Sequence, residues 1–149
     1  MAVTATTVRN QIETTIKAIT PTVQAAQKYV LFSDNQGDIE DDAAWSGSMR
    51  AFEVWIAEGA EGDYHHPAEF KNAQWFDIGV AYPAQEDLRA LDAILASDRH
   101  DLKAALDNQT NWGTDVFHQA LMKWDEPIRE KESWVLRVRL LVEFAESST

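Results

Sequence analysis

Hydrophobic residues recur at helical spacing in two stretches of the chain. In residues 4–18 and just beyond them, aliphatic side chains fall three or four positions apart, at Val8, Ile12, Ile16 and Ile19. This spacing places them along one face of a helix. The threonines at 4, 6 and 7 are candidate caps, and Pro21 ends the segment. We therefore predict an amphipathic helix here.

The second helical pattern covers residues 84–107. Its apolar stripe consists of leucines, namely Leu88, Leu91, Leu95, Leu102 and Leu106. Residues 97–100 (SDRH) interrupt the stripe with polar side chains, so we expect the helix to bend or split there.

Alternating apolar positions mark four strands, at residues 50–58, 74–82, 116–124 and 134–144. In each, the apolar set occupies one face. These sets include Phe52, Val54 and Ile56 in the first strand, Phe76, Ile78, Val80 and Tyr82 in the second, and Trp134, Leu136, Val138, Leu140, Val142 and Phe144 in the last. The polar segments 60–72 and 125–131 are predicted connections, and the short apolar run 29–32 is not assigned to an element.

The resulting order is α-β-β-α-β-β within one domain, residues 1–149. Strands joined by hairpins pair antiparallel, and each strand has one apolar face to cover. We therefore predict an α+β fold: a single, mostly antiparallel four-stranded sheet with two helices packed on one face. The last strand has no glycine or proline, and a long exposed strand of this kind invites pairing with another chain.

The face of the sheet turned away from the helices mixes aromatic and charged residues. Such a mixture suits partial burial against another subunit, because interfaces are enriched in large aromatics and arginine. The chain also holds six tryptophans. The candidate interface residues are Trp45, Trp55, Trp112, Arg50, Arg137 and Arg139.

Charge and composition exclude several classes of function. The chain has 149 residues, a net charge of -12 and no cysteine. Disulfides, thiolate metal sites and thiol nucleophiles are therefore absent. Phosphate backbones and anionic membranes should repel such a chain. No stretch matches a membrane helix or signal peptide, so we expect a protein that is cytoplasmic when synthesised.

Two segments invite comparison with metal sites. His65 and His66 lie near Asp63, Glu69 and Asp77, but adjacent histidines usually diverge and nothing fixes a third ligand. The acidic segment 33–42 resembles a calcium loop only loosely. With Asp34 as loop position one, Gly37 is at position four instead of six, and Trp45 is at position twelve, where a bidentate glutamate belongs. We predict no metal and no cofactor.

Catalytic motifs do not stand out either. His118 falls on the mixed face of the third strand, and no nucleophile elbow or phosphate-binding loop occurs. We therefore predict that the chain has no catalytic residues and is not an enzyme. The alternative from another class is a small metal-dependent hydrolase or ligand-binding α/β domain, with a metal at His65, His66 and Asp63.

Several ordered pieces of the chain carry a resemblance to a known family. These pieces are residues 8–16 (VRNQIETTI), 50–55 (RAFEVW), 80–83 (VAYP), the helix 88–102 and residues 137–144 (RVRLLVEF). Their layout resembles the tail terminator (tail completion) proteins of long-tailed bacteriophages. The resemblance spans nearly the whole chain and rests on architecture and loose patterns.

The resemblance implies a virion structural protein, located at the neck of the tail and in the host cytoplasm during assembly. Its subunits would form a homo-oligomeric ring, expected to be a hexamer, that caps the tail tube and ends its polymerisation. The implied partners are the tail tube protein and the head–tail connector protein, with DNA crossing the lumen without specific binding and no membrane. In such an assembly, segments 33–48 and 59–72 would be natural contact surfaces for neighbouring subunits and partner proteins. The alternative within this class is a head–tail connector or neck protein.

Overall fold

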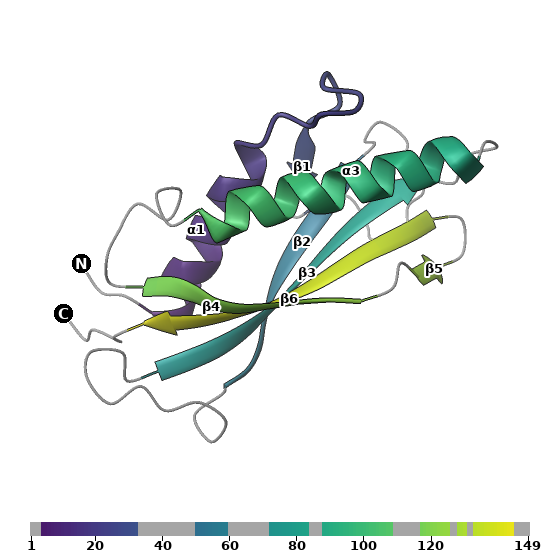
Figure 1. Cartoon of the computed structure of the whole chain (residues 1–149). Helices are drawn as coiled ribbons and strands as arrows, with labels where there is room; N and C mark the ends of the chain where they lie inside the picture. Colours follow the sequence, from purple (N-terminus) through teal and green to yellow (C-terminus); the bar gives the residue numbers. More distant parts are fainter. Residues whose placement is uncertain are drawn as a thin grey trace.

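Two helices pack on one face of a mixed β-sheet (Figure 1). The computed structural model describes residues 4–32, 50–59, 72–83, 88–108, 117–125, 128–130 and 133–144. Within these ranges the helices are α1 (Ala5–Lys17) and α3 (Leu88–Asp107). The strands are β1 (Tyr29–Leu31), β2 (Arg50–Gly59), β3 (Asn72–Pro83), β4 (Phe117–Trp124), β5 (Ile128–Glu130) and β6 (Ser133–Phe144). The predicted α+β class is confirmed.

The start of α1 is fixed by a capping box. The Thr4 hydroxyl accepts a hydrogen bond from the Thr7 backbone, and the Thr7 hydroxyl accepts one from the Thr4 backbone. This exchange satisfies two donors that would otherwise lack intrahelical partners. The predicted apolar stripe is confirmed, since Val8, Ile12 and Ile16 have no exposed surface.

Helix α3 runs without interruption through residues 97–100, so the expected bend or split is wrong. The physical reason is Asp98, which is fully buried and ion-paired within the fold instead of facing solvent. The buried stripe contains Leu91, Ile94, Leu95, Asp98, Leu102 and Leu106. Leu88 does not belong to it, because this first residue of the helix is 62% exposed.

The sheet order is β1-β2-β3-β6-β4, with β5 paired to β6. The four predicted strands pair antiparallel, but β1 pairs with β2 in parallel, which makes the sheet mixed. The prediction of four strands is therefore incomplete. Both additional strands, β1 and β5, have only three residues, and such short runs carry almost no periodic signal.

Strand β6 lies inside the sheet. It pairs with β3 along its whole length, and its other side pairs with β4 and β5. The expectation of an exposed C-terminal strand is thus wrong. Its burial on both faces explains the position: Leu140 and Val142 face the helices, while Leu141 and Glu143 are also buried, on the opposite face.

The main core fills the space between the helices and the sheet, with side chains from α1, α3 and all the longer strands. Helix α1 contacts β1, β2 and α3 on this side of the sheet (Figure 1). We call the sheet face away from these helices the outer face. It carries the odd-numbered side chains of β2, β3 and β6, because the apolar even-numbered ones enter the main core.

Candidate functional site

The most exposed aromatic side chain described lies on the outer face of the sheet. Trp55 of β2 is 52% exposed. Its ring rests over Gly79 of β3: a Cβ atom built at Gly79 would lie 3.2 Å from Trp55 Cζ3. Glycine therefore provides the space in which the indole lies across the neighbouring strand. A side chain held in this way loses little conformational entropy on binding, which is the property of a good interface anchor.

A second aromatic group is enclosed by cations on the same face. Trp75 is only 8% exposed and packs against Leu141 and Ala57. The Lys123 ammonium and the Arg139 guanidinium lie 5.2 and 5.3 Å from its ring centroids. Cation–π contacts of this kind contribute roughly 0.5–2 kcal/mol each. They fix the long basic side chains in place over the ring.

The strand register joins these groups into one row across the outer face. Trp55 is opposite Asp77, Asp77 is opposite Arg139, and Arg139 is opposite Lys123. Arg139 Nε lies 2.7 Å from Asp77 Oδ1, and both side chains are more than a third exposed. An exposed pair adds about 0–1 kcal/mol to stability. Its main effect is to orient charge beside the Trp55 anchor.

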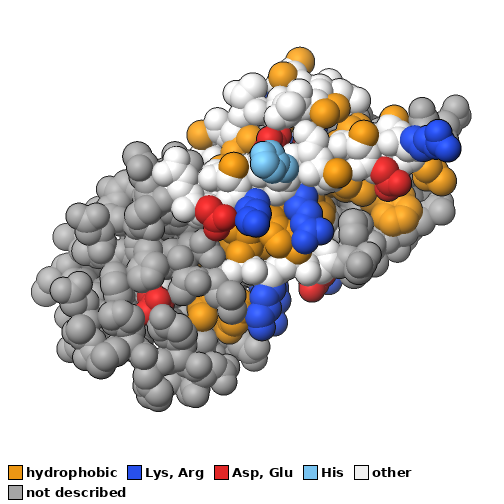
Figure 2. Space-filling view, viewed as in Figure 1, with side chains coloured by type: hydrophobic (Ala, Val, Ile, Leu, Met, Phe, Trp, Pro, Cys, Tyr) orange, Lys and Arg blue, Asp and Glu red, His pale blue; other side chains and the backbone are white. Residues whose placement is uncertain are grey.

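On the face shown in Figure 2, basic side chains lie along α3 above hydrophobic surface between this helix and β4. The Arg99 guanidinium sits 5.1 Å from the Trp124 ring centroid. Basic side chains thus cover apolar surface with their stems while their charged heads stay in water.

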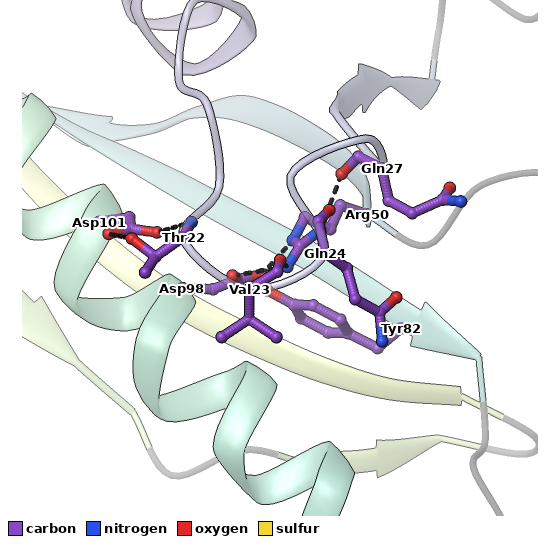
Figure 3. Close-up of polar contacts among 8 residues, drawn as sticks. All are labelled: Thr22, Val23, Gln24, Gln27, Arg50, Tyr82, Asp98 and Asp101. Carbon is purple, nitrogen blue, oxygen red and sulfur yellow. Dashed lines mark hydrogen bonds and ion pairs between the residues drawn. The ribbon is translucent and has the colours of Figure 1, made fainter.

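Arg50 requires a correction. It was a candidate interface residue, but its side chain has no exposed surface. Its Nε and Nη2 donate to the two Asp98 carboxylate oxygens at 2.5 and 3.0 Å. The remaining donors reach the carbonyl oxygens of Val23, Gln24 and Gln27 (Figure 3). All five N–H donors of the guanidinium are therefore used within the subunit.

Two tyrosines complete this buried network. The Tyr82 hydroxyl donates to Asp98 Oδ2 at 2.6 Å, and Tyr29 lies 5.7 Å below the Arg50 guanidinium. Burial, with a further contribution from the Asp98 charge, raises the pKa of both tyrosines well above the usual 10. Burial alone lowers the pKa of Arg50, but the hydrogen bonds and charge of Asp98 outweigh it, and the net shift is upward.

The network holds the connection between α1 and β1 against α3. Arg50 binds three carbonyl oxygens of this connection, and the Asp101 carboxylate accepts hydrogen bonds from the Thr22 amide and hydroxyl, both at 2.9 Å (Figure 3). Gln24 adopts a φ of 53° in the same turn. Because Arg50 and Asp98 are closed to solvent, we assign the network to folding instead of ligand binding.

A shallow groove lies between α1 and α3, lined by Thr15, Ile19, His100, Asp101 and small side chains. Asp101 is the one carboxylate along this groove, and its two oxygens accept hydrogen bonds from the amide and hydroxyl of Thr22. The Asp101 carboxylate is therefore engaged within the subunit.

The remaining predicted residues divide into two groups. Arg137 is exposed and Arg139 half-buried, both on the outer face with Trp55, as the alternation predicts. Trp45, Trp112 and the possible metal ligands Asp63, His65, His66 and Glu69 lie outside the described residues, as do segments 33–48 and 60–71. Asp77, named above beside these possible metal ligands, forms an ion pair with Arg139. His118 belongs to β4, and its side chain is not described.

In the described part of the chain, no group of three or more potential metal-ligating side chains occurs. Neither described helix has the length and apolar character needed to cross a membrane. Sequence reasoning missed the roles of Asp98 and Gly79. A polar residue on the apolar stripe of α3 and a glycine within a strand were the available signals.

No protein-family model matches the chain, and a search of curated protein sequences finds no significant match.

Proposed function

We propose that the chain is a structural subunit that assembles into a ring at the end of a bacteriophage tail tube, as a tail terminator. The observation that carries the proposal is the outer face, where Gly79 holds a half-exposed Trp55 beside ordered charges. A rigid aromatic anchor flanked by charged residues is typical of interface centres.

The arrangement of the two sheet faces supports an assembly role. The helices and the main core cover one face, while the outer face carries a small cluster of Trp75 and Leu141 with exposed residues around it. The Arg50–Asp98 network links strands, helix and connection in the subunit. A subunit that keeps its shape loses little entropy on assembly.

Charge supports the passage of DNA through such a ring. The described residues contain equal numbers of acidic and basic side chains, so the net charge of -12 resides entirely in the other segments of the sequence. DNA binding depends on cations that displace counterions from phosphates. A ring with no excess of cations would let DNA slide.

A tube-capping assay tests this function. Tail tube protein is polymerised with and without the purified chain, and the products are examined by electron microscopy. We expect shorter tubes that each carry one extra ring at a single end. Tubes of unchanged length without added density would overturn the proposal, and rings bound only to the head connector would instead assign the neighbouring neck protein.

The metal-dependent alternative is separated by a double variant, His65→Ala with His66→Ala. A hydrolase that uses this pair would lose metal uptake, measured by elemental analysis of the purified protein. We expect no metal in either protein and unchanged tube capping. Metal bound by the original chain and lost in the variant would favour the alternative.

A further inference from the structure

Among the described strands, the second half of β2 pairs only with β3. Strand β1 pairs with only its first three residues, Arg50 to Phe52. Residues 54–59, further along β2, have β3 as their one strand neighbour among the described strands. This stretch presents backbone donors and acceptors in the arrangement that binds a further strand.

The side chains at this edge are apolar on both faces of the sheet. Trp55 and Ile56 are consecutive, so they point to opposite faces, and they are 52% and 38% exposed. A partner docked on either face would cover only one of them. A strand added alongside β2 would cover both. Natural edges are often protected by lysine, proline or a β-bulge. Strand β2 contains no lysine or proline, and its register with β3 shifts only near its end, between Ile56 and Gly59.

We propose that this edge pairs with the β4 edge of a second copy of the chain, so that the sheet continues from one subunit into the next. The inference rests on the proposed ring and identifies its subunit contact. Strand β4 is the opposite end of the same sheet. It is eight residues long, long enough to pair with residues 54–59 of β2.

The strand directions agree with this pairing. Strand β2 is antiparallel to β3, β3 to β6, and β6 to β4, so β4 runs opposite to β2. A rotation about an axis roughly along the strands preserves their directions. A copy carried round such an axis therefore brings its β4 antiparallel to β2. Head-to-tail contacts of this type give a ring when the rotation between copies closes, and an open filament when it does not.

Charge and aromatic groups are complementary across the contact. Glu53 and Trp55 lie on the outer face of β2, and Lys123 lies on the outer face of β4. In a continuous sheet, Lys123 of one copy would lie between Trp75 of its own subunit and the β2 edge of the next. Opposite charges and cation–π pairs on neighbouring strands stabilise such pairing.

The first test is the mass of a double variant, Trp55→Lys with Ile56→Lys, measured by sedimentation velocity. Charges on both faces of the edge should prevent strand addition. We expect the mass to fall from that of the ring to the 16.8 kDa of one chain. The matched control is Leu88→Lys, which changes a residue that is 62% exposed at the start of helix α3, outside the sheet. A double variant that retains the ring mass, or an original chain that is monomeric throughout, would overturn the inference.

The second test uses the absence of cysteine from the chain. Glu53→Cys and Lys123→Cys are made in separate copies, which are mixed and treated with a short bis-maleimide. We expect cross-linked dimers in the mixture and none in either variant alone. Dimers from Glu53→Cys alone would show that β2 pairs with β2, and the inference would fail.

The two proposals fail in different ways. If the chain caps tubes but the double lysine variant still has the mass of the ring, the β2–β4 contact is wrong and the proposed function stands. If the edges cross-link but tubes are not capped, the contact stands and the function is wrong.

Discussion

At the scale of single residues, Arg50 and Asp98 show how a charge is tolerated in the core. Both are fully buried, and every guanidinium donor has an acceptor. The two residues are 48 positions apart. The sequence predicts a strand that begins at Arg50 and a helix through Asp98, but no local pattern links them. Only the packing of α3 on the sheet brings them together.

Removal of one partner should be costly because it leaves the other charge buried and unpaired. We expect Asp98→Ala to lower the free energy of unfolding by about 3–5 kcal/mol. The matched control is Asp92→Ala, an exposed position of the same helix, with an effect within about 0.5 kcal/mol. Urea unfolding followed by tryptophan fluorescence in the monomeric Trp55→Lys, Ile56→Lys background gives both values. Equal effects of the two variants would contradict the assignment of Arg50–Asp98 to folding.

The buried tyrosines make stability depend on alkaline pH. Because the pKa of Tyr29 and Tyr82 is raised in the folded chain, the unfolded chain releases these protons first. Stability is therefore full below the unfolded pKa of about 10 and declines as the pH rises above it. We expect Tyr82→Phe to reduce this decline, as measured by urea unfolding across the alkaline range. A slope identical to that of the original chain would contradict the proposed environment of Tyr82.

At the scale of elements, periodicity predicts the long helices and strands because each has one clearly apolar face. It fails where tertiary contacts decide. Strand β1 is only three residues long and owes its place to pairing with β2. Leu88 fits the leucine spacing but lies beyond the covered part of α3, so it is exposed. The interior position of β6 depends on pairing, which alternation does not encode.

The contact of Trp55 with Gly79 links two strands and can be tested by Gly79→Ala. The added methyl group would lie 3.2 Å from Trp55 Cζ3. Since the indole is half exposed, it can move aside, and we expect a change in unfolding free energy within about 0.5 kcal/mol. The displaced indole should weaken ring formation. Sedimentation should then show that half of the rings dissociate at a higher protein concentration than in the original chain. Unchanged assembly would show that the resting position of Trp55 does not matter.

At the scale of the whole molecule, charge is distributed unevenly. The described elements are neutral as a group, and the segments outside them carry the net -12. Composition alone indicates the sign of the charge, but the structure is needed to separate these regions. Alternation places Arg50 and Trp55 on opposite faces of one strand, but only the structure shows that Arg50 is fully buried and Trp55 is half exposed.

This distribution predicts that the assembled protein does not bind DNA. We expect no complex with duplex DNA at about 100 μM protein and physiological salt, where many basic proteins already bind nonspecifically. Fluorescence anisotropy of a labelled duplex measures this. Binding that weakens steeply with added salt would reveal phosphate contacts and contradict a lumen through which DNA slides.

The central claim is that copies of this chain form a closed ring, and native mass spectrometry of the purified protein tests it most directly. We predict one dominant cyclic species of six copies of the 16.8 kDa chain, which is lost when Trp55 and Ile56 are replaced by lysine. A spectrum that contains only single chains, both alone and with tail tube protein, would contradict the claim.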